Sequence, residues 1–189
     1  MDAPEKLTTT RLVLRQWRDD DIDALAAING DPEVMRHFFA PLTREQTERT
    51  VADYQASFAA HGFGPWAVEV AETGELIGLA GLLPVRFEAH FTPAVHLIAK
   101  FAAHAWRRHF GTEAAQEAIR DGFQRVQLEE IVAFTPKRNE PSWQGMASLG
   151  MTHEEADDFT HPGLTDGDPL RDHVLYRLRT PETAGRPPA

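Results

Sequence analysis

The chain has 189 residues, of which 42% are hydrophobic and 25% charged, a composition typical of a globular protein with a full hydrophobic core. Its formal net charge of −10 argues against a general nucleic-acid binder or a protein of anionic membrane surfaces, because both need a basic face. It has no cysteine, which excludes disulfides and cysteine-bound zinc, and no apolar run near the ~20 residues of a membrane helix, so we expect a cytoplasmic protein.

The first third of the chain is predicted to form a strand followed by helices. Residues 11–17 are short, roughly alternating and rich in strand formers, which indicates a strand. Three aspartates at 19–21 then supply the cap and first-turn acids of a helix that ends near Gly30. Thr43 caps a longer helix, which His61-Gly62 ends.

The rest of the chain is predicted to alternate strands with two helices. Strands are expected at 66–70, 76–83, 94–101, 130–135 and 173–178. The element order implies an α/β (α+β) fold in which helices pack on one mixed sheet. We expect a single domain over residues 1–180 and a disordered Pro-rich tail at 181–189.

The helix predicted near 110–123 has an entrance suited to an anion. Two arginines and a histidine lead into a glycine, and a 3.6-residue apolar stripe follows. Uncovered N–H groups and the helix dipole favour a phosphate at such an end, although helices also begin at Gly-Thr for capping alone. The predicted anion site consists of Arg107, Arg108, His109, Phe110, Gly111 and Thr112.

Several separated motifs occur in a characteristic order over residues 10–178. They are TTTRLVLRQWRDDDIDAL, GDPEVM, GFGPWAVEVAETGELIGLAGL, FTPAV, Thr112-Glu113-Ala114, Asn139-x-x-Ser142, Leu149-Gly150-Met151 and HVLYRL. Together they resemble the GNAT acetyltransferases, and most closely the RimJ/RimL-type subgroup.

The resemblance implies a mostly antiparallel sheet splayed between its fourth and fifth strands, 94–101 and 130–135, with helices on both faces. Acetyl-CoA or another acyl-CoA would lie in the splay, with its pyrophosphate on the helix entrance near Thr112. Its pantetheine would pair with the fourth strand, at Leu97, Ile98 and Ala99. An amine of a small molecule or a peptide N-terminus would attack the thioester directly while a general base takes its proton.

The chain departs from the subgroup at two diagnostic places. The subgroup's Trp-Gly-Arg-Gly-Tyr-Ala-Thr-Glu-Ala reads Trp-Arg-Arg-His-Phe-Gly-Thr-Glu-Ala here, so Arg107 and His109 replace glycines that permit positive φ. A side chain at these positions either costs free energy or changes the loop. His96 also replaces an acid that is a plausible base in the subgroup.

Three functional readings follow from these departures. The first is an acyl-CoA-dependent N-acyltransferase. The second is an enzyme that binds another phosphate ligand, such as a nucleotide-linked metabolite, and performs histidine-assisted bond cleavage or proton transfer. The third is a non-catalytic ligand-binding module, since a fold does not fix a reaction.

The candidate catalytic residues each have a second interpretation. His96 is either the general base or a hydrogen-bonded structural histidine. Asn139 and Ser142 either assist the departing thiolate and contact the cofactor or cap the helix that follows. Trp143 is either a surface for a ring of the cofactor or a core residue, and Tyr176 is either an acid or a core residue.

The candidate substrate-binding residues are Phe38, Trp66, Phe87, Glu88 and His90. The acidic run at 154–158 would favour a cationic substrate if it borders the acceptor entrance. The nine histidines show no spacing typical of a metal site, so we expect no metal. We expect a small-molecule substrate, no nucleic-acid or membrane partner, and a homodimer as a possibility offered by exposed sheet edges.

Overall fold

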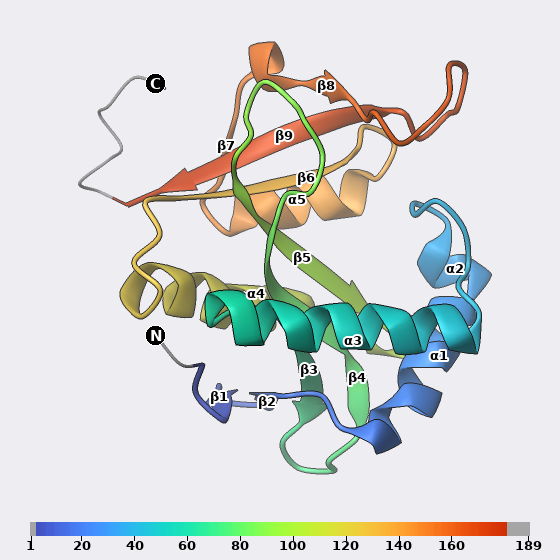
Figure 1. Cartoon of the computed structure of the whole chain (residues 1–189), viewed down its shortest axis with the longest axis vertical. Helices are drawn as coiled ribbons and strands as arrows, with labels where there is room; N and C mark the ends of the chain where they lie inside the picture. The colour runs from blue at the N-terminus through green and yellow to red at the C-terminus, as the bar shows by residue number, and fades with distance from the viewer. Residues whose placement is uncertain (1–2, 181–189) are drawn as a thin grey trace.

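The computed structural model describes residues 3–180, so the predicted tail at 181–189 lies outside the described residues. Within this range the centre of the molecule is a nine-stranded sheet (Figure 1). Its strands are β1 (Lys6–Thr8), β2 (Leu12–Arg15), β3 (Pro65–Val70), β4 (Leu76–Pro84), β5 (Val95–Phe101), β6 (Glu130–Pro136), β7 (Thr152–His153), β8 (Phe159–Thr160) and β9 (Asp172–Arg179). They lie in the order β1-β2-β3-β4-β5-β6-β9-β7, with β8 on β9, and β5–β6 is the parallel pair in an otherwise antiparallel sheet.

Helices cover both faces of this sheet, as predicted (Figure 1). They are α1 (Ile22–Gly30), α2 (Pro32–Met35), α3 (Arg44–His61), α4 (Phe110–Gln124) and α5 (Glu140–Ser148), with short 3-10 turns at Asp19–Asp21, Ala103–Ala105 and Glu155–Asp157. Alternate residues of the central strands serve the two faces: Leu79 packs with α1 and α3, whereas Leu82 and Leu97 pack with α4. The loop 85–94 covers the part of the α3 face beyond the reach of α3.

Local sequence signals set most of the element ends. Thr43 and Gln46 form the capping box that starts α3, and Gly62 ends this helix in the left-handed conformation with φ 74°. Helix α5 begins at Glu140 and accommodates Pro141 in its first turn, where the missing N–H of proline would have no helical partner. Strand β1 was not predicted, since three residues at a sheet edge carry no periodic signal. In residues 3–180, no helix has both the length and the apolar character to cross a bilayer.

Arg15 joins β2 to the entrance of α1 and to β3 through a buried ion cluster. Its guanidinium donates to both carboxylate oxygens of Asp21 at 2.7 Å and also contacts Glu69. The side chains of Arg15 and Asp21 are 7% and 5% exposed. Burial by itself would raise the pKa of Asp21, but the hydrogen bonds and charge of Arg15 outweigh it and hold this pKa below its usual value.

We predict that Asp21→Ala lowers the free energy of unfolding by about 3 to 5 kcal/mol, because it leaves the guanidinium of Arg15 buried without its main partner. Urea unfolding at neutral pH measures this change. Asp23→Ala is the matched control, since Asp23 is 81% exposed in its pair with Arg44 and should cost less than about 1 kcal/mol. Equal losses for the two variants would contradict a structural role for the cluster.

Candidate functional site

Strands β5 and β6 diverge after a single pair of residues. His96 pairs with Val132, whereas β4 and β5 stay paired along the whole of β5. Ala99 is exposed although it lies in the middle of β5. The sheet therefore opens between the two strands predicted to splay, and the β6-facing edge of β5 beyond His96 has no strand partner among residues 3–180.

Helix α4 begins beside the open end of β5. A Cβ added to Gly111 would lie 3.5 Å from the ring of Phe101, so the first turn of the helix packs on the last residue of the strand. The backbone N–H of Glu113 donates to the carbonyl oxygen of His109 at 3.1 Å. The N–H groups of residues 110–112 precede this first helical bond and have no helical acceptor, an arrangement that favours an anion together with the helix dipole.

The loop before α4 keeps a left-handed backbone at the two positions where glycine was expected. Arg107 has φ 60° and His109 has φ 61°, and both residues are exposed. This conformation costs an ordinary L-residue roughly 1–2 kcal/mol. A side chain at these positions was expected either to cost free energy or to change the loop. The backbone geometry that glycine permits is present without glycine, which implies the cost in free energy.

Glu113 fastens this loop to the start of β2, a role that the sequence analysis missed. Its carboxylate accepts hydrogen bonds from Arg11 Nε at 2.7 Å, from the Arg11 backbone N–H at 2.9 Å and from Thr9 Oγ1 at 2.6 Å. Arg11 Nη1 also donates to the carbonyl oxygen of Arg108 at 3.0 Å. Burial opposes ionisation of Glu113, but these bonds and the charge of Arg11 hold its pKa below the usual value. In the sequence, Glu113 appears only as an acid in the first turn of a helix, a common position that does not indicate its contacts with Thr9 and Arg11.

Arg107 and Arg108 remain available to a ligand. Neither guanidinium has a carboxylate partner in the described part of the chain, and that of Arg108 lies 4.6 Å from the centre of the Phe110 ring. Phe110 itself is 2% exposed, so only its backbone faces the entrance. The predicted anion site would thus consist of backbone N–H groups and two arginines without an ion-pair partner in residues 3–180.

The α3 side of the opening carries aromatic rings. The ring of His96 stacks on Phe134, with 4.9 Å between centroids and 10° between planes. Together with Tyr54, Phe87 and His161 these rings line a pocket of about 270 Å³. His96 and Phe87 were predicted as site residues from the sequence. Tyr54, Phe134 and His161 were not, because they lie on separate elements and belong to no shared motif.

His96 is a neutral imidazole at physiological pH. Burial lowers its pKa to about 4. No hydrogen bond joins its ring to another residue within 3–180, so the structural alternative of a hydrogen-bonded histidine is not observed. The ring therefore carries an unprotonated nitrogen at the point where β5 and β6 part.

Asn139 and Ser142 lie at the far end of β6 and neither side chain caps α5. Asn139 Nδ2 donates to Thr135 Oγ1 at 2.9 Å, and its side chain accepts no capping bond. The Ser142 backbone N–H donates to the carbonyl oxygen of Asn139 at 3.0 Å, and its partly exposed hydroxyl has no partner in the described residues. The capping alternative is therefore not observed.

Trp66 and Tyr176 lie apart from the site. Trp66 is 2% exposed and packs against Phe58 with 4.5 Å between ring centroids, so the prediction that it binds substrate is wrong. Tyr176 is 8% exposed, stacks on His153 and packs with α5, on the face of the sheet away from His96. Trp143 belongs to the same cluster, and its Nε1 donates to the carbonyl oxygen of Lys137. Core packing is the observed role of these side chains.

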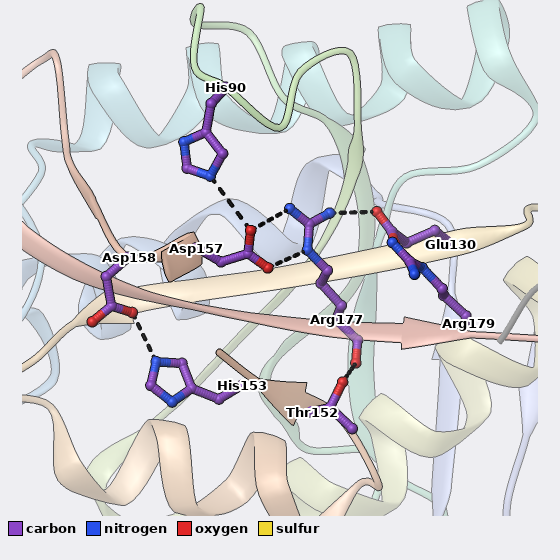
Figure 2. Close-up of polar contacts among 8 residues, drawn as sticks. All are labelled: His90, Glu130, Thr152, His153, Asp157, Asp158, Arg177 and Arg179. Atoms are coloured by element: carbon purple, nitrogen blue, oxygen red, sulfur yellow. Dashed lines mark hydrogen bonds and ion pairs between the residues drawn. The ribbon is translucent and has the colours of Figure 1, made fainter. Parts of the chain in front are cut away.

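His90 points to an ion network on β9 instead of the pocket (Figure 2). Its Nε2 lies 3.6 Å from Asp157 Oδ1, and Asp157 also accepts a 2.6 Å hydrogen bond from Arg177 Nε. Asp158 contacts His153 at 2.8 Å and Lys137 at 2.9 Å. Two carboxylates of the acidic run at 154–158 are thus neutralised by neighbouring cations. Glu88 is exposed, and Phe38 is 37% exposed.

Residues 11–152 match the family model described as an acetyltransferase (GNAT) domain. This chain belongs to the GNAT acetyltransferase family. It is 28% identical to the uncharacterized N-acetyltransferase p20 of Bacillus licheniformis, and the match covers 79% of this chain and 84% of p20. It is also 28% identical to the FsC-acetyl coenzyme A-N(2)-transacetylase of Aspergillus fumigatus, over 88% of this chain and 74% of that protein.

Solved structures share the fold of this GNAT chain. A GNAT-family acetyltransferase from Bordetella pertussis superposes with a TM-score of 0.76 at 23% identity, covering 94% of this chain and 100% of that one. Spermidine N-acetyltransferase from Vibrio cholerae, solved with CoA and spermine, gives a TM-score of 0.71 at 17% identity over 90% and 96% of the two chains. The relatives' names and this fold support an acyltransferase-type enzyme, and they lend no support to the nucleotide-type ligand or the non-catalytic module.

We predict that His109→Gly raises the free energy of unfolding by up to about 1 kcal/mol, because glycine adopts φ 61° without the cost borne by histidine. Chemical denaturation measures the change. Gln116→Gly, at an exposed position of α4 with ordinary helical geometry, is the control and should lose about 1 kcal/mol. A loss at position 109 as large as that at 116 would show that the left-handed backbone carries no cost.

Proposed function

We propose that this GNAT enzyme transfers an acyl group, acetyl in particular, from acyl-CoA to an amine of a small molecule or a peptide N-terminus. We place it in the RimJ/RimL-type subgroup, with an atypical phosphate loop. The observation that carries the proposal is the entrance of α4, where three N–H groups and the unpaired Arg107 and Arg108 stand at the open end of β5. An elongated molecule with a pyrophosphate at one end fits an anion site that continues into an opening between strands.

The residues around the opening suit the parts of acyl-CoA. The pyrophosphate would accept hydrogen bonds from the N–H groups of residues 110–112, with Arg107 and Arg108 adding charge. The pantetheine amides would pair with the free edge of β5 at 97–99, which lacks a strand partner in the described chain. The thioester would then lie near His96, where the two strands meet.

The chemistry requires a proton to leave the amine and a thiolate to depart. The amine nitrogen forms a bond to the thioester carbonyl carbon, the C–S bond breaks, and the products are an amide and CoA. Acyl-CoA would supply the activated thioester, and the neutral ring of His96 would take the amine proton. The amide of Asn139 and the hydroxyl of Ser142, at the far end of β6 from His96, would contact the cofactor along the opening and not the departing sulfur. Tyr176 takes no part in this scheme because it faces the other side of the sheet.

The pKa of His96 determines how the rate should depend on pH. A group with a pKa of about 4 is unprotonated throughout the range from pH 6 to 9 and contributes no inflection there. The acceptor, in contrast, must lose its ammonium proton before it attacks. The rate should therefore rise with pH until the amine of the acceptor is deprotonated.

We predict that acetyl-CoA and CoA at 100 times their Kd raise the free energy of unfolding by about 2.7 kcal/mol, whereas NAD, ADP-ribose and simple nucleotides give much less. Thermal shift assays measure this response. Arg107→Gln/Arg108→Gln should weaken CoA binding with little change in the melting temperature of the free protein. Arg49→Gln, which removes one exposed and unpaired charge from α3, should bind CoA normally. A protein that does not respond to either CoA species would refute the proposal.

We predict that His96→Gln lowers kcat by about 10²-fold to 10⁴-fold, the usual contribution of a general base, and leaves the Kd of acetyl-CoA unchanged. Steady-state kinetics and CoA titrations measure the two quantities. The wild-type profile of kcat/KM against pH should rise through the pKa of the chosen amine, with no step near pH 6.5. A variant with wild-type kcat would remove His96 as the base.

A further inference from the structure

The basic residues of the described chain fall into two groups according to their partners. Nine arginines have an ion-pair partner, namely Arg11, Arg15, Arg44, Arg86, Arg120, Arg125, Arg171, Arg177 and Arg179. Among residues 3–180, the cations without one are Lys6, Arg18, Arg36, Arg49, Lys100, Arg107, Arg108 and Arg138. Arg107 and Arg108 are accounted for by the proposed CoA site. Arg36, Lys100 and Arg138 are not.

These three cations lie around the end of α2, which crosses from the segment after β5, where it packs on Ala102 and Trp106, toward Arg138 in the loop after β6. The guanidinium of Arg36 lies 5.7 Å from the Trp106 ring, on the segment that leads to α4. On the other side, His37 is close enough to Arg138, in the loop after β6, for the charge of that arginine to act on it. The α2 end thus spans from the end of β5 to the end of β6.

A pocket of about 400 Å³ lies at this crossing. It is lined by Arg36, His37, Arg138, Asp168, Pro169 and Leu170. The carboxylate of Asp168 is the one acid of the lining, and it already accepts a 2.8 Å hydrogen bond from the Leu170 N–H. His37 Nδ1 is buried without a hydrogen-bond partner in the described residues. The pocket therefore has cationic donors and an unpaired polar atom.

Lys100 adds a buried positive charge beneath the same segment. It is 8% exposed, its Nζ lies 3.7 Å from Met35 Sδ and 5.0 Å from the Phe38 ring, and no carboxylate of residues 3–180 pairs with it. Burial lowers its pKa to about 8. A buried ammonium without a counter-ion is costly to the folded protein, and an anion bound nearby would offset that cost.

We propose that this pocket binds an anionic group, a carboxylate or a phosphate, at the far end of the acceptor. The inference rests on the proposed function and narrows it: the acceptor is an amine that carries a negative charge, not a polyamine. His96 and Lys100 are four residues apart on β5, which places them on the same face about 13 Å apart along the strand. Lys100 Nζ in turn contacts Met35, the residue before Arg36 of the pocket lining. The amine and the anion are therefore separated by a chain of several atoms, as in an ω-amino acid or a short peptide.

A series of acceptors tests this inference. The series consists of ω-amino carboxylates of increasing chain length, the ω-aminoalkyl phosphates, the matching ω-amino carboxamides, and spermidine. We expect kcat/KM for the best acid to exceed that of its carboxamide by at least 10-fold, with a maximum at an intermediate length. Arg36→Gln and Arg138→Gln should each remove most of this preference, measured within each variant as the ratio of kcat/KM for the acid to kcat/KM for its carboxamide. Equal rates for acids and carboxamides, or a preference for spermidine, would overturn the inference.

The phosphate of the cofactor is the other anion that this pocket could hold. If so, Arg138→Gln would raise the KM for acetyl-CoA and abolish the preference for acetyl-CoA over its 3′-dephospho form. The ratio of kcat/KM for the acid to kcat/KM for the carboxamide would stay unchanged. This result would also overturn the inference. Arg49→Gln is the charge-matched control for both arms.

Failure of the proposed function can be distinguished from failure of this inference, because thermal shift measures CoA binding in the absence of an acceptor. If CoA binds but no amine in the series turns over, calorimetric titration of the acids and carboxamides into the CoA complex decides. Tighter binding of the acids, lost in Arg138→Gln, supports the inference, and equal or absent binding overturns it.

Discussion

The divergence of β5 and β6 from one shared pair of residues is the constraint on which the rest of the molecule depends. A sheet that opens leaves backbone N–H and C=O groups without partners, and such groups are costly unless water or a ligand satisfies them. The two faces are therefore packed independently, with α4 and α5 on one side and α1 and α3 on the other (Figure 1). The opening persists because each strand is held by its outer neighbour, β5 by β4 and β6 by β9.

Most unpaired positive charges of the described chain gather near the opening between β5 and β6. The protein carries a net charge of −10, yet most of its arginines are paired with carboxylates on the flanks, as in the network of Asp157, Arg177 and Glu130 (Figure 2). Pairing cancels charge locally, so the cations that remain unpaired dominate the field near them. Arg36, Lys100, Arg107, Arg108 and Arg138 surround the opening. An acidic protein thus presents a positive entrance of limited extent, which suits a small anionic ligand better than a polyanion.

The position of the anion site could be predicted from the sequence because its components are adjacent in the chain. Arg107 and Arg108, Gly111 and the apolar stripe of α4 all belong to one stretch, and the helix entrance is a local structure. The opposite wall was not predictable in this way. His96, Phe134 and His161 come from β5, β6 and the loop after β8, and no spacing in the chain indicates that their rings meet.

The errors have a related cause. Trp66 and Tyr176 lie on strands, where successive side chains point to opposite faces, and the sequence does not state which face a ligand occupies. His90 belongs to a loop rich in aromatic residues, and its partner Asp157 comes from a segment more than sixty residues later. Lys100 was not singled out because a lysine in a strand gives no sign of burial until α2 is placed over it.

The sequence by itself determined the order and ends of most helices and strands, the class of fold and the helix entrance with its two arginines, because caps, turns and periodicity act over a few residues. The tertiary structure decided which carboxylate each arginine meets, which face of each strand borders the opening, and that His96 is neutral. These properties depend on burial and on distances between elements far apart in the chain. Charge pairing in particular is a competition among all the ionic groups, and only the folded arrangement shows that three cations beside α2 have no ion-pair partner within residues 3–180.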